Sequence, residues 1–256
     1  MHEMAKVEAI YRYPIKGLSA ERLASTRLKA GETIAADRLY AIENGPSGLD
    51  AAAPAYLPKQ RFLMLMRNER LARLRTRFDA ATHVLAIELD GVEAARGDLR
   101  SPAGRAAIER FFAEFCAGEL RGAPKVLHAD GHSFSDVARK VVSIINLASL
   151  AQLENGLGAP VDPLRFRGNL YVTGWPAWHE FSLLGRELAI GPAARVRIVK
   201  RIQRCAATEV DPQTGIRDLP IPKRLLQVFG HGDCGVYAEV IADGEIAIGD
   251  QISDDR

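Results

Sequence analysis

The chain has 256 residues, of which 47% are hydrophobic and 26% charged, with 34 Lys and Arg against 32 Asp and Glu. This composition excludes a disordered, collagen-like or disulfide-scaffold protein, and the length suffices for two modest domains or one large one. Three cysteines, a charged N-terminus and no apolar run long enough for a membrane span predict a cytoplasmic protein with reduced thiols. The balanced charge does not indicate a nucleic-acid partner, and the lack of a long apolar run predicts no membrane partner.

The N-terminal residues show the two-residue period of strands. Alternating side chains over 7–13 predict a first strand that ends in a turn at 14–17. The same period over 34–42 predicts a second strand that runs into Asn44 and Gly45, a strong hairpin dipeptide. Arg38 stands in the apolar row of this strand. It therefore needs an anionic partner, unless it lies partly exposed at the strand's edge.

The middle of the chain contains the clearest predicted helix. Residues 46–58 predict a mobile loop, and 59–78 fit either a strand or a helix. Residues 84–89 predict a hairpin strand, which is followed by Asp90 and Gly91. The helix lies within 101–118, with Ser101 as its N-cap, Pro102 in the first turn, Gly118 at the exit and one apolar stripe. Beside that stripe, Cys116 is expected to be an inert core thiol.

The C-terminal half is richer in strands than in helices. Strands are predicted over 165–174, 195–202 and 234–250, the last turning at Asp243 and Gly244, and short helices over 146–158 and 219–230. Strands and helices do not alternate regularly enough for a doubly wound sheet. The pattern predicts a β-rich α+β fold, with two mixed β-barrel-like domains or sandwiches and a few short helices.

Cys205 is the strongest candidate for chemistry. It follows the end of a predicted strand, and Lys200, Arg201 and Arg204 lie close to it in sequence. Nearby cations favour the thiolate, which is the form that attacks, carries sulfur or binds a metal. The alternative is a structural cysteine beside a solvated basic strand.

A second basic segment carries a weaker signal. If residues 165–174 form a strand, Arg165, Arg167 and Asn169 share one of its faces. Guanidinium groups bind phosphate oxygens in a bidentate fork, so this face predicts an anion clamp. A solvent-facing strand is the alternative.

His231 and Cys234 have the spacing of two metal ligands, with Cys205 as a conceivable third. No further motif completes a zinc site. The glycines around them instead indicate tight backbone turns, with Cys234 as a core thiol or a resolving thiol for Cys205. The absence of dinucleotide-binding, Walker, nucleophile-elbow and kinase motifs disfavours nucleotide enzymes and serine hydrolases.

Several segments together resemble the MOSC family, named for the C-terminal domain of molybdenum cofactor sulfurases. Those similar to the family are YPIKGL at 13–18, DRLY at 37–40, SFSDVA, SIINLASL, FRGN at 166–169, RCAATEVDPQTG at 204–215, CGVYAEV and GEIAIGD. The resemblance covers nearly the whole chain. It divides the chain into an N-terminal β-barrel domain with a linking helix, 1–118, and a MOSC domain, 119–256.

The resemblance implies a pocket between the two domains with Cys205 as its central residue. In amidoxime-reducing relatives the corresponding thiolate binds molybdenum, and in sulfurase relatives the domain delivers sulfur to the molybdenum cofactor. This cofactor, a molybdopterin, carries a phosphate. The residues that the resemblance assigns to it are Lys16, Arg38, Arg167, Asn169 and Arg204.

The chain departs from the family pattern at three places. Gly17 stands where cofactor-binding relatives have Ser, Gly168 replaces the Pro before Asn169, and residues 58–66 replace an Arg-Gln-x-Pro stretch. Pyridoxal phosphate binding belongs to the family's functional description, but this chain has no pyridoxal-phosphate desulfurase domain. It also has no iron–sulfur motif, so electrons or sulfur would come from a partner.

Three functions follow from the resemblance. The first is reduction of N-hydroxylated or N-oxide small molecules at a bound molybdenum cofactor, with electrons from an external donor. The second is transfer of persulfide sulfur on Cys205, received from a cysteine desulfurase. The third is non-catalytic binding of a phosphorylated ligand, which would not depend on the thiol.

Overall fold

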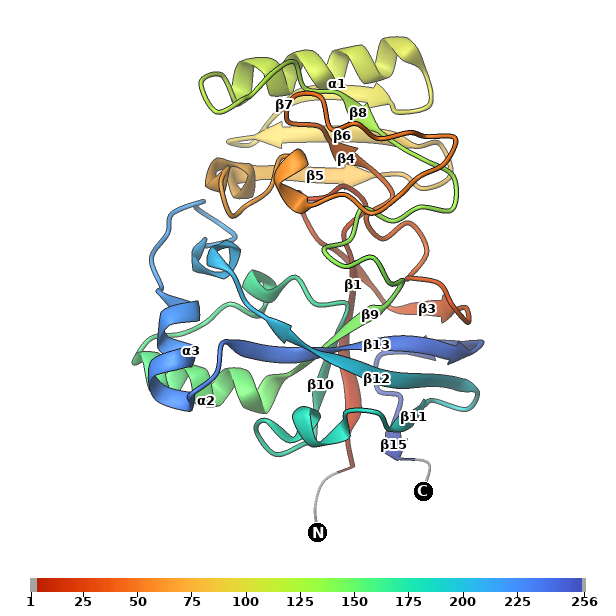
Figure 1. The fold of residues 1–256 in the computed structure, drawn as a ribbon, viewed down its shortest axis with the longest axis vertical. Helices are drawn as coiled ribbons and strands as arrows, with labels where there is room; N and C mark the ends of the chain where they lie inside the picture. The colour runs from red at the N-terminus through yellow and green to blue at the C-terminus, as the bar shows by residue number, and fades with distance from the viewer. Residues whose placement is uncertain (1–3, 255–256) are drawn as a thin grey trace.

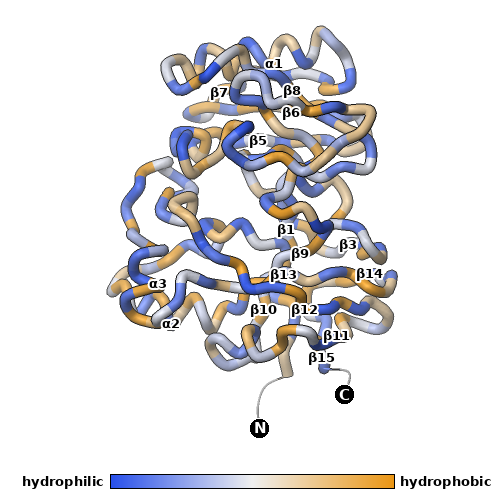
Figure 2. The backbone as a smooth tube through the Cα atoms, viewed as in Figure 1, coloured by the Kyte–Doolittle hydropathy of each residue, from blue (hydrophilic) through white to orange (hydrophobic). Residues whose placement is uncertain are grey.

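Two β-rich bodies stack along the long axis of the molecule (Figure 1). This computed structural model describes residues 4–254. Strands greatly outnumber helices, which confirms the predicted β-rich α+β class. Hydrophobic stretches run through the strands of both bodies (Figure 2) and form two main cores, one in each body.

The upper body is built around a three-stranded antiparallel sheet that α1 (Pro102–Phe115) covers (Figure 1). Its strands are β5 (Leu74–Phe78), β6 (Val84–Leu89) and β7 (Val92–Asp98), beside the two-stranded pair β4 (Ala41–Ile42) and β8 (Val126–Leu127). Ser101 caps α1 as predicted, because its side chain accepts a hydrogen bond of 2.9 Å from the backbone N–H of Gly104. Ile108, Phe112 and Phe115 bury the predicted apolar stripe of the helix.

The lower body contains an eight-stranded sheet in the order β15-β11-β12-β13-β9-β10-β1-β2. Its strands are β1 (Lys6–Arg12), β2 (Glu21–Leu23), β9 (Val142–Asn146), β10 (Leu170–Thr173), β11 (Glu187–Ile190), β12 (Ala194–Gln203), β13 (Asp233–Ala242) and β15 (Ile252–Asp254). A second pair, β3 (Ser25–Leu28) with β14 (Gly244–Ala247), is antiparallel. The predicted helices α2 (Leu147–Leu157) and α3 (Ile221–Phe229) lie side by side on one flank (Figure 1).

The first strand of the chain belongs to the lower body. β1 pairs antiparallel with β10, and Val7 and Ile10 are buried in the lower core. A bulge between Val7 and Ala9 interrupts the predicted alternation, so Ile10 rather than Ala9 faces that core. The turn after Arg12 places Ile15 and Leu18 in the upper core, and the chain then returns to the lower body with β2 and β3. The division of the chain at residue 118 stays a prediction.

The predicted second strand over 34–42 is wrong, because only β4 at its end is extended. Ala36 and Arg38 have left-handed backbones, with φ of 62° and 51°, outside the extended region that strand residues adopt. The hairpin at Asn44 is wrong as well. The Asn44 side chain accepts a hydrogen bond of 2.9 Å from the backbone N–H of Arg121, and β4 pairs with the distant β8.

The turn at Asp243 and Gly244 separates two strands, as predicted, but they do not pair with each other. β13 pairs with β12 and β9, whereas β14 pairs with β3. Residues 46–58 are irregular, and 59–78 contain two short 3-10 helices, Lys59–Arg61 and Glu69–Arg73, before β5. Within residues 4–254, no helix is long and apolar enough to cross a membrane.

Candidate functional site

A cavity of about 300 Å³ lies between the two bodies. Its lining comes from the turn after β1, the segments 59–66 and 135–143, the residues before β10 and the end of β12. All six residues assigned to the site from the sequence line this cavity: Lys16, Arg38, Arg167, Asn169, Arg204 and Cys205.

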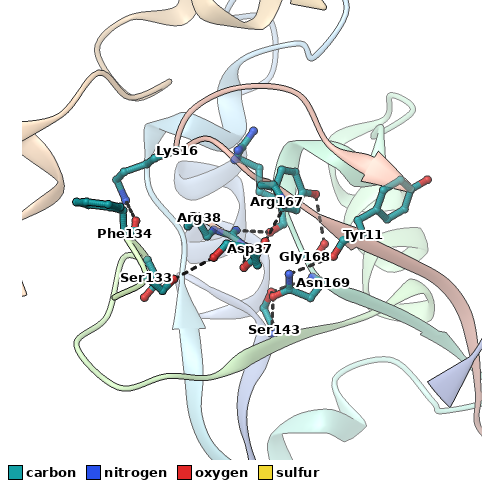
Figure 3. Close-up of polar contacts among 12 residues, drawn as sticks. Tyr11, Lys16, Asp37, Arg38, Ser133, Phe134, Ser143, Arg167, Gly168 and Asn169 are labelled. Carbon is teal, nitrogen blue, oxygen red and sulfur yellow. Dashed lines mark hydrogen bonds and ion pairs between the residues drawn. The ribbon is translucent and has the colours of Figure 1, made fainter. Parts of the chain in front are cut away.

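The turn after β1 places Arg38 by backbone hydrogen bonds. The Arg38 N–H donates to the carbonyl of Tyr13 at 2.8 Å, and the Tyr13 N–H donates to Asp37 Oδ1 at 2.8 Å. The Arg38 guanidinium then donates to Asp37 Oδ2 at 2.5 Å and to the carbonyl of Arg167 at 3.0 Å (Figure 3). Arg38 therefore has the anionic partner that the sequence required, although it lies in a turn rather than in a strand.

Tyr13 lies between two guanidinium groups. Its ring centroid is 4.7 Å from the guanidinium carbon of Arg38 and 4.3 Å from that of Arg167, distances typical of cation–π contacts. Burial, together with the charge of Arg38, lowers the pKa of Arg167 to about 10, so Arg167 stays charged at neutral pH. Its guanidinium donates to the carbonyl of Leu18 at 2.8 Å and makes no ion pair with any described residue. Arg167 thus presents an unneutralised positive charge to the cavity.

A series of polar contacts leads from Lys16 through Asp136 and Lys59 to Cys205. The Lys16 ammonium donates to the carboxylate of Asp136. It also donates to the carbonyl of Phe134 at 2.9 Å (Figure 3). Lys59 lies 3.7 Å from the other Asp136 oxygen, and its ammonium donates to Cys205 Sγ at 3.2 Å. A cation in contact with sulfur stabilises the thiolate.

Two residues of the site, Asp136 and Lys59, were not among those predicted from the sequence. Asp136 lies within the SFSDVA segment that carries the family resemblance, and that was its one available signal. Lys59 begins a stretch that fitted either a strand or a helix, and it lies 146 residues before Cys205. Only the folded chain brings its ammonium to the sulfur.

Burial and neighbouring charges together determine the protonation states of Lys16, Asp136 and Lys59. Burial lowers the pKa of Lys16, although Asp136 opposes the shift. Burial alone would raise the pKa of Asp136, but Lys16 and Lys59 outweigh it and hold that pKa well below its ordinary value. Burial likewise opposes protonation of Lys59, yet Asp136 and Cys205 raise its pKa overall. Lys59 and Asp136 are therefore both charged at neutral pH.

Acid should lower the stability of the folded protein, because it protonates the Asp136 carboxylate. Since its folded-state pKa lies below the unfolded value, the carboxylate stabilises the fold above about pH 5 and loses this effect as the pH falls below about 4. The side chain is 47% exposed, so we expect only about 1 kcal/mol. Urea unfolding at about pH 6 and about pH 3 should show a larger acid loss for the wild type than for Asp136→Asn. Equal losses would contradict this assignment.

The predicted strand over 165–174 forms only from Leu170 onward, as β10, so the shared face of Arg165, Arg167 and Asn169 is wrong. Residues Pro163–Phe166 form a 3-10 helix, and Arg167 has a left-handed backbone with φ of 51°. Arg165 pairs with Asp218 at 2.8 Å and Asp211 at 3.1 Å, so protein carboxylates already neutralise it. Arg167 alone of the two arginines keeps a free charge.

Asn169 and Arg204 hold the walls of the cavity. The Asn169 side chain accepts hydrogen bonds from the N–H and hydroxyl of Ser143 and donates to the carbonyl of Tyr11 (Figure 3). The Arg204 guanidinium donates to the backbone carbonyls of Cys234, at 2.8 Å, and Phe166, at 2.9 Å. Most of the hydrogen-bonding capacity of Asn169 therefore serves the fold.

Cys205 lies between β12 and the 3-10 helix Ala206–Glu209, where it is partly accessible. Arg217 fixes this segment against the upper body, because it donates to the carbonyl of Ala206 at 2.7 Å and to that of Met66 at 2.8 Å. Cys116 and Cys234 are buried, and burial raises the pKa of each to about 12, so both remain thiols at neutral pH. Cys205 is the accessible thiol of the chain.

His231 lies among aromatic rings rather than beside Cys205. Its ring contacts Trp178, Phe181 and Phe229. No cluster of three or more His, Cys, Asp or Glu side chains suited to a metal ion exists in the described part of the chain. The three-ligand arrangement of His231, Cys234 and Cys205 is therefore not formed.

Packing explains two departures from the family pattern. Gly17 has a φ of 82°, and a side chain on it would lie 3.1 Å from the carbonyl oxygen of Leu63. At Gly168 an added Cβ would lie 2.4 Å from Ile145 Cγ1. Both positions thus require glycine in this fold.

Family models match both halves of the sequence. The MOSC N-terminal beta barrel domain matches residues 4–119, and the MOSC domain matches residues 128–253. The chain belongs to the MOSC family. The recognition made from the sequence is therefore confirmed, and the cavity lies between the two matched regions.

Individual relatives resemble this MOSC protein over part of its length. Mitochondrial amidoxime reducing component 2 of Bos taurus is 32% identical over 123 residues, and that of Rattus norvegicus is 31% identical over 123 residues. Each match covers 43% of this chain and 36% of the relative, so the matched part is about a third of the relative's length.

Solved structures show weaker likeness. The YUAD protein of Bacillus subtilis is 12% identical with a TM-score of 0.45, covering 98% of this chain and 94% of its own. YiiM of Geobacillus stearothermophilus is 22% identical with a TM-score of 0.36, covering 45% of this chain and 54% of its own.

Proposed function

We propose that this MOSC protein binds molybdenum cofactor in the cavity between its two bodies, with Cys205 as the metal ligand. With the cofactor bound there, the protein reduces N-hydroxylated or N-oxide small molecules with electrons from an external donor. One observation carries the proposal: the accessible thiol, in contact with Lys59, lines the same cavity as the unneutralised guanidinium of Arg167.

The residues of the cavity fit an anionic, thiolate-bound group. Eight Lys and Arg side chains and two Asp side chains line it, an excess of six positive charges. Arg165 is neutralised by carboxylates outside the lining, which leaves an excess of five. A phosphate would offset part of this excess, with Arg167 as a donor whose charge no carboxylate of the described residues neutralises.

Each residue has a defined task in this proposal. Arg38 and Arg167 bind the phosphate, Cys205 supplies the thiolate, and Lys59 holds a proton at Nζ beside the sulfur. When bound, the cofactor supplies a metal centre that passes two electrons to the substrate. Reduction of an N-hydroxyl group consumes two electrons and two protons, and yields the amine or amidine and water. The electrons come from a partner, because the chain carries no iron–sulfur motif.

The substrate class and the cellular compartment of this protein stay predictions. The amidoxime reducing relatives suggest N-hydroxylated substrates, but their matched region is a third of their length. The relatives are named as mitochondrial, whereas the cytoplasm was predicted for this chain from its sequence.

The test is reduction of benzamidoxime by protein purified from a host that makes the cofactor, with a chemical electron donor. We expect benzamidine to form in proportion to the molybdenum content of each preparation. A molybdenum-loaded protein that leaves benzamidoxime unchanged would refute the reductase function.

The accessible Cys205 also suits a second function, that of sulfur carrier. A thiolate beside Lys59 can accept the terminal sulfur of a desulfurase persulfide, and the desulfurase cysteine then leaves as a thiolate. Incubation with a cysteine desulfurase and free cysteine should then add the mass of one sulfur atom to Cys205. An unchanged mass refutes this function. Affinity for phosphorylated ligands that survives in Cys205→Ala would instead indicate a plain binding protein.

A further inference from the structure

A second depression, which we call the outer groove, opens beside the cavity. It has a volume of about 430 Å³ and shares five lining residues with the cavity: Asp136, Val137, Val141, Lys200 and Tyr237. Its other lining residues are Tyr56, Ala138, Arg139 and Val199. Because of the shared residues, the outer groove continues the cavity outward, so a molecule that reaches Cys205 can extend into it.

The surface of the outer groove is largely apolar and aromatic. Val137, Val141 and Val199 line it together with the phenol rings of Tyr56 and Tyr237. The Tyr56 hydroxyl donates to the backbone carbonyl of Asp136 at 3.2 Å, which ties the loop 46–58 to the segment after Phe134. Aliphatic side chains flanked by aromatic rings favour a flat, apolar ring over a polar chain.

The charged groups at the outer groove are unevenly neutralised. Lys16 and Lys59 hold the carboxylate of Asp136, and Arg139 lies 3.8 Å from Glu239. Lys200 is exposed, and its ammonium has neither a hydrogen bond nor an ion pair with any residue in 4–254. A free cation at the junction of cavity and groove attracts an anionic substituent.

We propose that the outer groove binds the ring of an aromatic substrate, and that Lys200 pairs with a carboxylate on that ring. The inference rests on the proposed function and narrows it to N-hydroxylated aromatic acids, whose N–O group lies in the cavity toward Cys205. Tyr56 and Lys200 are specificity-determining residues in this account, and neither belongs to the residues that hold the cofactor.

Binding of two probes tests this proposal. Benzamidoxime and 4-carboxybenzamidoxime differ only in the carboxylate, and calorimetry on the full chain measures the affinity of each without requiring turnover. We expect the carboxylated probe to bind about threefold more tightly, the size of an exposed ion pair. Lys200→Met should abolish this difference and leave the affinity for benzamidoxime unchanged.

Two further variants complete the test. Arg197 lies on the same strand as Lys200, but it pairs with Glu187 and does not line the outer groove. The Arg197→Met variant should therefore keep the threefold difference in affinity between the probes. Tyr56→Ala should lower the affinity for both probes about fivefold, because one ring contact is lost. Equal affinities in the wild type, a difference that survives in Lys200→Met, or no binding of either probe would overturn the proposal.

Failure of the outer groove and failure of the proposed function are distinguishable. If the protein reduces benzamidoxime but binds both probes equally, only the proposed role of the outer groove is contradicted. A protein without molybdenum or turnover that still shows the Lys200-dependent difference supports the groove as a binding site and refutes the reductase.

Discussion

Cys205→Ala should purify without molybdenum and without amidoxime reductase activity. Loss of a group that merely orients a metal ligand lowers affinity about 10–100-fold, and loss of the ligand itself should cost at least as much. The fold should survive, because Cys205 is only partly buried and Lys59 keeps its ion pair with Asp136. Elemental analysis of wild type and variant, prepared in parallel from the same host, measures this effect.

Cys116→Ala is the matched control for that substitution. Cys116 belongs to the core of the upper body and does not line the cavity, so its loss should leave the molybdenum content unchanged. Full molybdenum occupancy in Cys205→Ala would show that another group holds the metal, and the assignment of Cys205 would be wrong.

Arg38→Ala should lower the free energy of unfolding by about 3 kcal/mol, the cost of breaking a buried ion pair. Asp37 is only 3% exposed, and without the guanidinium its buried carboxylate would keep the hydrogen bond from the Tyr13 N–H but lose its ion pair. The carbonyl of Arg167 would lose its partner as well. Urea denaturation measures the change.

The comparison for Arg38 is Arg197→Ala. Arg197 and Glu187 form a pair in which each side chain is about half exposed, so its loss should cost less than about 1 kcal/mol. A similarly small effect in Arg38→Ala would mean that Asp37 finds another partner. Because Arg38→Ala also weakens the fold, Arg38→Lys, which keeps the charge, is the better probe of phosphate binding.

Local signals in the sequence were sufficient for much of the fold. The cap at Ser101, the Asp-Gly turn between β6 and β7 and the apolar stripe of α1 depend on neighbouring residues, and all three are present. The helices α2 and α3 were also predicted, since their caps and turns lie next to them in sequence.

The errors arose where distant contacts override local preference. Residues 34–38 alternate like a strand, but backbone bonds to Tyr13 and the pairing of Asp37 with Arg38 hold them in a turn. Arg165 and Arg167 share a strand face only if the backbone is extended, and Asp211 and Asp218 draw Arg165 away. Both errors concern cavity-lining residues, where buried charges determine the backbone.

In the candidate site, too, local sequence patterns predicted some residues, and contacts between distant residues determined the others. Recognisable segments were enough to assign all six predicted residues, and the fold brings them to one cavity. Lys59 and the ring of Tyr13 escaped notice, because their importance depends on contacts with Cys205, Arg38 and Arg167. Such contacts leave no local pattern in a single sequence.

The central claim is that the cavity of this MOSC protein holds molybdenum cofactor. Elemental mass spectrometry for molybdenum, with pterin fluorescence on the same sample, tests it most directly on wild-type protein from a host able to make the cofactor. The account predicts stoichiometric molybdenum and pterin in the purified protein. Neither molybdenum nor pterin, from a host whose other molybdenum enzymes are loaded, would contradict it.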